Sequence, residues 1–192
     1  MSLPLKDSLR RDMGERLRAL SAQERDRQSR LIASALAHEV SLDSPSLVAA
    51  YLPLPSEPDP RHWLLPSGAS WALSRVVYPD QLRFHDVGAS LPDRPPGALG
   101  VGEADPDQDL EVPAEALTLV LVPGLAFDPA TGHRLGRGRG CYDRFLASLP
   151  PHTPRVGLAF DVQLLPKIPH EPHDVPLDAI ASPSGLQWIQ RQ

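Results

Sequence analysis

The most concentrated group of chemically informative residues lies in a segment where glycine and arginine alternate. Four arginines and three glycines fall within eleven residues, with Asp143 as the only acid: Arg134, Gly136, Arg137, Gly138, Arg139, Gly140 and Arg144. The whole chain has a formal net charge of -5, so this basic island indicates a small anionic ligand, whereas a polyanion would favour a broad basic surface. Glycines let the backbone approach a ligand closely, and their amides can then cradle a phosphate beside a helix N-terminus.

Two common phosphate-binding motifs do not account for this segment. No Gly-Lys-Ser/Thr follows Gly138, which excludes a Walker A loop, and the G-x-G-x-G spacing does not match a dinucleotide-binding fingerprint. A Gly/Arg segment alone is equally typical of a flexible turn. Here an apolar run precedes it and an amphipathic segment, Cys141–Leu149, follows it, which is a ligand-binding context in α/β proteins. Asp143 could also hold a metal beside the phosphates.

Hydrophobic periodicity predicts the elements that position this segment. A stripe of apolar residues predicts a helix over Leu5–Leu20, and the capping box Ser21–Glu24 predicts a second helix that runs to about Glu39. Apolar runs predict buried strands. We expect a short helix over Arg61–Leu65. We expect strands over Leu47–Leu52, Trp71–Val77, Leu82–Val87, Leu117–Val122, Arg155–Phe160 and Asp178–Ser182. The pattern predicts an α/β layered fold with a largely parallel sheet and flanking helices.

Composition narrows the class of protein. At 192 residues, one domain spanning residues 1–192 is the default. No apolar run reaches 18 residues and no secretory signal is visible, so we expect no membrane segment. Cys141 is the only cysteine, which fits the cytoplasm. The acidic balance argues against nucleic acid as a partner, and we expect a monomer that binds small molecules.

Three segments of the chain resemble those of a known family. The segment V-P-G-L-A-F-D followed by G-H-R-L-G-R-G-R-G-C-Y-D-R-F-L, within residues 122–146, resembles the signature of the 5-formyltetrahydrofolate cyclo-ligases, also called 5,10-methenyltetrahydrofolate synthetases. Lys6–Arg10 is similar to the family's K-x-x-L-R opening, and His173-Asp174 is similar to its late aspartate. The resemblance covers nearly the whole chain and is weakest over Pro53–Asp109. It implies a three-layer fold like that of phosphosugar isomerases and CoA-transferases.

The resemblance also implies an activity and a set of site residues. The activity is the ATP- and Mg²⁺-dependent conversion of 5-formyltetrahydrofolate to 5,10-methenyltetrahydrofolate, with release of ADP and phosphate. Arg134 and Arg137 are the candidate catalytic residues, and Asp143 and Asp174 are the candidate magnesium ligands. The nucleotide-binding candidates are Lys6, Asp7, Ser8, Leu9, Arg10, Arg134, Leu135, Gly136, Arg137, Gly138, Arg139, Gly140, Cys141 and Tyr142. The folate-binding candidates are Arg10, Leu52, Glu57, Arg137, Gly138, Arg139, Gly140 and Cys141.

Several of these residues also have an ordinary structural interpretation. Lys6 and Arg10 share one helix face, and such a pair is usually only a solvated face. Glu57 lies in a proline-rich loop without the threonine that is usual in the family, and a lone acid in a loop is usually only a solvated surface residue. Cys141 occupies a position where the family commonly has a tyrosine, and a cysteine there is typical of a small apolar contact. If a tyrosine shapes the folate pocket, its replacement alters substrate affinity.

Two other functions remain compatible with the sequence. The first is a non-catalytic relative that binds folate or nucleotide, which the departure at Cys141 would favour. The second is a different enzyme on the same fold, such as a phosphosugar isomerase or a CoA-transferase. An isomerase needs no ATP and a transferase needs an acyl-CoA carboxylate, so nucleotide binding distinguishes both from a cyclo-ligase.

Overall fold

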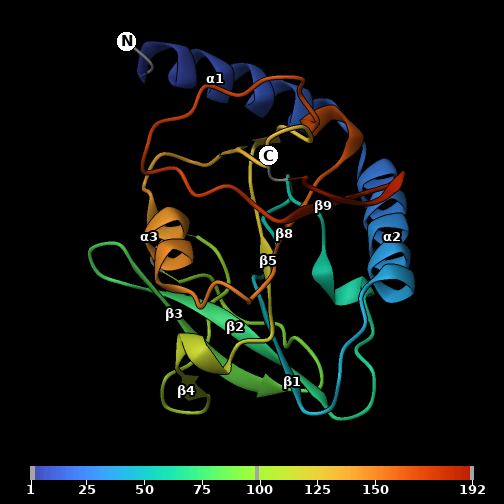
Figure 1. Cartoon of the computed structure of the whole chain (residues 1–192), viewed down its shortest axis with the longest axis vertical. Helices are drawn as coiled ribbons and strands as arrows, with labels where there is room; N and C mark the ends of the chain where they lie inside the picture. The colour runs from blue at the N-terminus through green and yellow to red at the C-terminus, as the bar shows by residue number, and fades with distance from the viewer. Residues whose placement is uncertain (1–2, 98–99, 191–192) are drawn as a thin grey trace.

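The computed structural model describes residues 3–97 and 100–190. Within these residues, eight strands form one sheet in the order β10-β9-β8-β5-β1-β2-β3-β4, and β6 and β7 form a separate two-stranded ribbon (Figure 1). The helices are α1 (Leu3–Ala19), α2 (Ala22–Glu39) and α3 (Cys141–Ser148), with 3₁₀ turns at η1 (Pro60–His62), η2 (Ala114–Ala116) and η3 (Asp161–Gln163). The strands are β1 (Ser46–Ala50), β2 (Ala69–Val77), β3 (Gln81–Gly88), β4 (Leu110–Val112), β5 (Leu119–Val122), β6 (Ala126–Phe127), β7 (Arg134–Leu135), β8 (Arg155–Leu158), β9 (Ala179–Ser182) and β10 (Gly185–Trp188).

The centre of the large sheet is parallel and both of its edges are antiparallel. Strands β2, β1, β5, β8 and β9 pair in parallel, with Val48 opposite Trp71 on one side of β1 and opposite Leu119 on the other. Strands β3 and β4 extend one edge and β10 extends the other, each in antiparallel pairing. The expectation of a largely parallel sheet is therefore correct for its buried centre, where strands covered on both faces read as continuous apolar runs.

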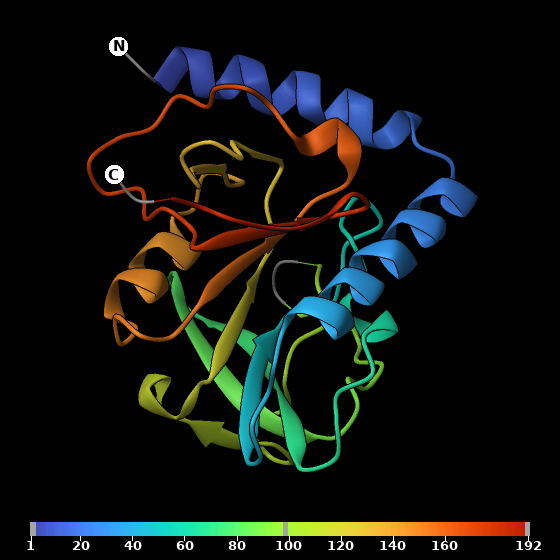
Figure 2. The same ribbon diagram turned by 45° about the vertical axis from the view of Figure 1, so that its right-hand side comes forward.

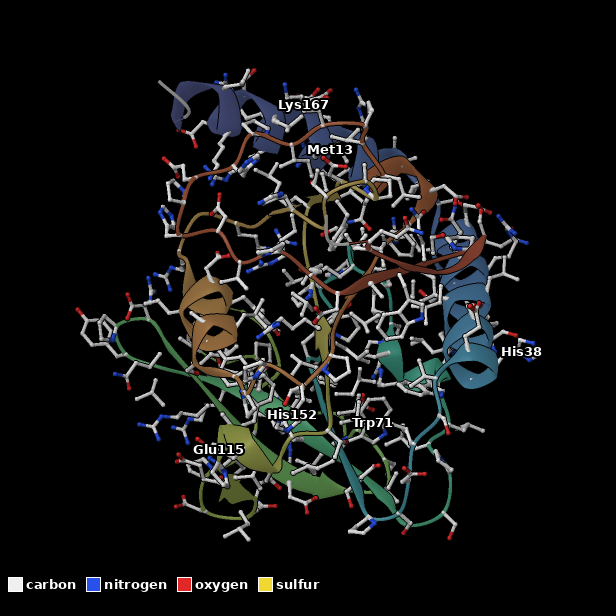
Figure 3. All side chains as sticks on the ribbon, viewed as in Figure 1. Met13, His38, Trp71, Glu115, His152 and Lys167 are labelled. Carbon is white, nitrogen blue, oxygen red and sulfur yellow. The ribbon has the colours of Figure 1, made fainter. Side chains whose placement is uncertain are left out.

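Helices cover both faces of the sheet and make three layers. Met13 and Leu17 of α1 and Leu36 of α2 belong to one apolar cluster with the strand residues that face them, including Val48 and Leu121. The opposite faces of the same strands pack with α3 and its flanking residues in a second cluster, which holds Ala49, Val120, Leu146 and Leu149. Figure 2 shows α1 and α2 on one side of the sheet and α3 on the other. In Figure 3, Met13 lies under α1 on the inner side, while His38 projects outward from α2.

The helices begin and end close to where the sequence places them. The Ser21 side chain accepts a hydrogen bond from the Glu24 amide at 3.1 Å and starts α2, as expected of a helix N-cap. The Glu24 carboxylate accepts hydrogen bonds from the Arg27 and Gln28 side chains, so the Ser21 bond is the half of the predicted capping box that the structure shows. Where the sequence predicts a short helix over Arg61–Leu65, the structure has the 3₁₀ turn η1. This turn begins one residue earlier, at Pro60, and ends at His62.

Four strands of the structure are absent from the sequence-based prediction. Strands β4, β6, β7 and β10 have two to four residues each, and such lengths leave no measurable alternation of apolar and polar residues. Strand β7 matters most, because Arg134 and Leu135 of the Gly/Arg segment pair with β6, whereas the sequence indicated no strand there. Among the described residues, no helix has the length and apolarity that a membrane crossing requires.

Candidate active site

A cavity of about 350 Å³ lies at the carboxyl ends of two neighbouring parallel strands, β1 and β5. The chain leaves β1 toward β2 on one side and leaves β5 toward β8 on the other, so the sheet order reverses between them. Ligands of open α/β sheets bind outside the carboxyl ends of strands at such a switch point. The segments after β1 and β5 supply Leu52, Glu57 and Gly124 to the cavity wall.

The Gly/Arg segment forms another wall of this cavity. It follows β7, and Gly136, Arg137, Arg139 and Gly140 line the cavity directly. Gly138 has φ +98° and Gly140 has φ +68°, conformations that favour glycine. Gly140 is also the residue that caps α3, so the segment runs straight into a helix N-terminus. We call residues 136–140 the glycine loop.

An ion pair joins the glycine loop to the segment after β1. An Arg137 guanidinium nitrogen lies 2.9 Å from Glu57 Oε1, and the same guanidinium donates a 3.2 Å hydrogen bond to Ser56 Oγ. Glu57 Oε2 accepts from the Leu54 amide at 3.0 Å. The Glu57 side chain is 6% exposed and that of Arg137 is 45% exposed. Two residues that the resemblance assigns to the folate site are thus brought together across the cavity, with the carboxylate fixed and the guanidinium accessible.

A second arginine is buried beneath the loop. Arg134 contacts Asp143 Oδ1 at 3.0 Å and donates to the Val175 carbonyl at 3.3 Å. Burial lowers the pKa of Arg134, and the neighbouring Asp143 carboxylate opposes that effect. The guanidinium carbon also lies 6.0 Å from the ring centroid of Tyr142. Arg134 therefore provides a positive charge whose position is held from three sides.

The N-terminal half of α1 lies against the outer side of the glycine loop. Arg10 Nε donates to the Gly136 carbonyl at 3.0 Å. Lys6 is buried, and its Nζ lies 2.6 Å from Asp174 Oδ2 and 3.0 Å from Glu171 Oε2. Burial is the largest single influence on the pKa of Lys6 and lowers it, but the bonds to both carboxylates together raise the pKa above its ordinary value. The segment after η3, coloured orange to red in Figures 1 and 2, runs beside α1 and carries both acids.

The two candidate magnesium ligands come from adjacent segments. Asp143 Oδ1 accepts from the Val175 amide at 3.3 Å, which places α3 next to the residue that follows Asp174. In this structure each carboxylate faces a cation, Arg134 for Asp143 and Lys6 for Asp174. Carboxylate oxygens are the donors that Mg²⁺ accepts, so the residues present fit the ion. Glu171, His173 and Asp174 also offer ligand atoms within 4.8 Å of one another.

The remaining predicted residues divide into two groups. Leu52 and Cys141 line the cavity, and the half-buried Cys141 opens α3 beside Tyr142. Tyr142 also lines the cavity, and burial raises the pKa of its hydroxyl. The other group turns elsewhere in this structure: Asp7 pairs with Arg10, Ser8 is exposed, Leu9 packs on the core and Leu135 is part of it. Arg144, which the sequence places in the basic island, instead contacts Asp80 Oδ2 at 2.6 Å.

Sequence reasoning missed the wall that β2, β3 and the segment before β4 supply. Ser74, Val76, Leu82, Val101 and Glu103 all line the cavity, as does Tyr51. They come from the region where the motif resemblance is weakest, and no spacing in the sequence shows that they meet. The only available signal was the buried strand periodicity over Trp71–Val77, which located β2 without showing which of its residues face the cavity.

Comparisons with known proteins agree on one family. The model of the 5-formyltetrahydrofolate cyclo-ligase family matches residues 3–183. A mouse 5-formyltetrahydrofolate cyclo-ligase is 30% identical over 190 residues, which cover 91% of this chain and 92% of that protein. The Mycolicibacterium smegmatis cyclo-ligase is 36% identical over 151 residues, which cover 71% and 73% respectively. The solved structure of the Aquifex aeolicus 5,10-methenyltetrahydrofolate synthetase superposes with a TM-score of 0.79 at 28% identity, over 98% of this chain and 94% of that one.

Proposed function

Because the chain belongs to the 5-formyltetrahydrofolate cyclo-ligase family, we propose that its cavity binds the reduced folate and that its glycine loop presents the γ-phosphate of ATP to it. The enzyme converts 5-formyltetrahydrofolate to 5,10-methenyltetrahydrofolate. One observation carries the placement of the two substrates. The inner side of the glycine loop lines the cavity, while its outer side receives Arg10 from α1. A loop with one side at the cavity and the other at α1 can contact the folate and ATP at the same time.

The chemistry explains why a phosphate-binding loop must meet a folate pocket. The oxygen of the N5-formyl group is a poor leaving group, so N10 cannot displace it directly. Transfer of the γ-phosphoryl group to that oxygen breaks the bond to ADP. N10 then bonds to the formyl carbon and loses its proton, and the C–O bond breaks to release phosphate as the methenyl ring forms. The protein must position the γ-phosphate, neutralise its charge and keep water away from it.

The positive groups around the loop match these tasks. Arg137 is accessible at the cavity and Arg134 is fixed below it, so both can contact the transferred phosphoryl group, as catalytic residues. The amides of the glycine loop and the N-terminus of α3 supply further positive dipoles. Arg10 contacts the outer side of the loop and Lys6 lies four residues before it on α1, where the rest of the nucleotide would bind. Leu52, Glu57 and Cys141 face the folate.

Magnesium completes the proposed site. Asp143 and Asp174 would hold the ion, which supplies charge neutralisation for the phosphate oxygens when bound. For Asp174 to bind it, the carboxylate must share Lys6 with the ion or release it, since Lys6 Nζ lies 2.6 Å away. The lone cysteine and the acidic composition support an enzyme that acts in the cytoplasm.

An isotope experiment tests the central step of this proposal. 5-Formyltetrahydrofolate carrying ¹⁸O in its formyl group is converted with MgATP, and the released phosphate is analysed by mass spectrometry. Attack of the formyl oxygen on the γ-phosphorus predicts one ¹⁸O in each phosphate. Label that appears in water instead would show that the oxygen leaves without being phosphorylated, and the proposed role of the glycine loop would be wrong.

A further inference from the structure

The cavity contains a second carboxyl group, Glu103, that no motif of the sequence indicates. It lines the cavity from the segment between β3 and β4, next to the bridge that joins Pro96 and Gly102. Burial raises the pKa of Glu103, while the Val76 backbone amide and the charge of Arg75 act in the opposite direction. The side chain is therefore held against β2 and is half-buried where Glu103 lines the cavity.

The surroundings of Glu103 differ from those of Glu57. Glu57 has an arginine at 2.9 Å and a backbone amide at 3.0 Å, so its charge is compensated by the protein. Among residues 3–97 and 100–190, no ion pair is made by Glu103. Its Oε2 lies only 2.5 Å from the place where a Cβ on Gly97 would be, so this carboxylate occupies space that a glycine leaves open. A half-buried carboxylate that makes no ion pair is stabilised further when a ligand supplies hydrogen-bond donors to it.

The walls beside Glu103 indicate what kind of ligand would supply those donors. Val76, Leu82 and Val101 line the same cavity and offer apolar surface for the face of a ring. The pyrimidine edge of a reduced pterin carries an N3–H and a 2-amino N–H side by side. Two parallel N–H donors match the two oxygens of one carboxylate. Each oxygen has a second lone pair, so the carboxylate can still accept the hydrogen bond from the Val76 amide.

We propose that Glu103 determines specificity for the pterin by accepting hydrogen bonds from its N3–H and 2-amino groups. This contact anchors the end of the ring system remote from the reacting atoms. With that edge fixed against β2, the N5-formyl group can be directed toward the glycine loop on another wall of the cavity. The inference rests on the proposed binding of folate in this cavity.

Binding measurements on the full chain test the proposal. Glu103→Gln keeps the shape of the side chain but replaces one acceptor with a donor. Calorimetry should show a dissociation constant for 5-formyltetrahydrofolate that rises about tenfold or more, the scale of one lost charge-assisted contact, and an unchanged constant for a non-hydrolysable ATP analogue. Glu115→Gln is the matched control, because Glu115 is exposed in η2, at the end of the molecule away from α1 (Figure 3), and does not line the cavity. Its folate affinity should equal that of the parent.

A folate analogue without the 2-amino group tests whether Glu103 binds that group of the pterin. The parent protein should bind this analogue about tenfold more weakly than 5-formyltetrahydrofolate, and Glu103→Gln should lose much less between the two ligands. An equal loss in both proteins would overturn the proposal, as would parental folate affinity in Glu103→Gln. If Glu103→Gln fails to fold, Glu103→Asp, which keeps the charge but shortens the reach, replaces it in the same cycle.

One further variant separates the inference from the placement on which it rests. Val76→Trp fills the cavity from β2, and its fold is checked by circular dichroism. If folded Val76→Trp binds folate as the parent does, folate does not occupy this cavity and both proposals fail. If Val76→Trp loses folate while Glu103→Gln keeps it, only the role of Glu103 is wrong.

Discussion

Arg137 and Glu57 are 80 residues apart in the sequence, and their side chains meet at 2.9 Å across the cavity. The contact ties the glycine loop to the segment that leaves β1. Glu57 is nearly buried and also accepts a hydrogen bond from the Leu54 amide, so its carboxylate has a fixed position. The carboxylate therefore orients the more exposed Arg137 guanidinium. A guanidinium that is oriented by one carboxylate and still half exposed is prepared to meet a phosphate.

Removing this guanidinium should impair catalysis and leave the fold intact. We expect Arg137→Ala to lower kcat/KM by about tenfold to a hundredfold, because a hydrogen bond to a charged group contributes roughly 1.5–3 kcal/mol. The midpoint of thermal unfolding should change little, since an ion pair this exposed adds little to stability. Arg30→Ala, which breaks an exposed pair within α2, is the control. Parental kinetics in Arg137→Ala would remove this residue from the site.

The magnesium dependence of the rate tests the two carboxylates. Asp143→Asn and Asp174→Asn should each raise the magnesium concentration for half-maximal rate, because each loses a hard anionic ligand. Asp12→Asn serves as the control, since Asp12 forms only an exposed pair with Arg16. Should both variants keep the parental magnesium curve, Asp143 and Asp174 act only as partners of Arg134 and Lys6.

The glycine loop contains a matched pair for a backbone test. Gly140 has φ +68°, where a side chain is strained, whereas a Cβ on Gly136 would meet open space. Gly140→Ala should lower the free energy of unfolding by about 1–2 kcal/mol, and Gly136→Ala should change it little. Chemical denaturation measures both. Equal stability of the two variants would show that Gly140 does not need its left-handed conformation to start α3.

Cys141 tests the one departure from the family pattern that faces the cavity. We expect Cys141→Tyr to lower the KM for 5-formyltetrahydrofolate several-fold, because an aromatic contact adds about 0.5–1.5 kcal/mol beyond burial. The KM for ATP should remain nearly unchanged. Cys141 is half-buried and lines the cavity, so a ring at this position would face the proposed folate site. A tyrosine variant with the parental folate KM would mean that Cys141 makes only a packing contact.

His85 predicts how stability depends on pH. It is 3% exposed on β3, and burial lowers its pKa from the usual 6.5. The unfolded chain takes up a proton below pH 6.5 that the folded chain resists, so stability is full above this pH and falls as the pH drops toward the lowered pKa. His85→Leu should lose less unfolding free energy between pH 7 and pH 5 than the parent, roughly the interval around the usual imidazole pKa.

The control for this measurement is the exposed His38. His38→Gln should retain the parental decline, because it leaves the buried His85 unchanged. If His85→Leu and the parent decline in parallel, protonation of other groups governs the acid sensitivity, and the burial of His85 contributes nothing to it.

The sequence predicted the elements with long apolar patterns and missed those that depend on pairing. The stripe of Met13 and Leu17 locates α1, and the continuous run of β5 locates a central strand, because burial leaves a periodic signal. Strand β7 leaves none: Arg134 and Leu135 are extended only because they pair with β6. The first residues of the Gly/Arg segment are consequently held by strand pairing, which their residue types do not indicate.

The same distinction holds for the site. Motifs located the glycine loop, Cys141 and Lys6, because their residues are close together in the chain or match a family segment. The contacts between them come from the fold. Neither the pairing of Lys6 with Asp174, 168 residues away, nor the cavity wall around Glu103 follows from spacing, since the strand order decides which segments become neighbours.

A turnover measurement tests the central claim most directly. The protein is mixed with 5-formyltetrahydrofolate, ATP and Mg²⁺, and the absorbance of 5,10-methenyltetrahydrofolate is followed together with ADP release. The account predicts methenyl product and ADP in equal amounts, and no product when ATP or Mg²⁺ is omitted. Product formed at the same rate without ATP, or tight folate and nucleotide binding with no turnover, would contradict it.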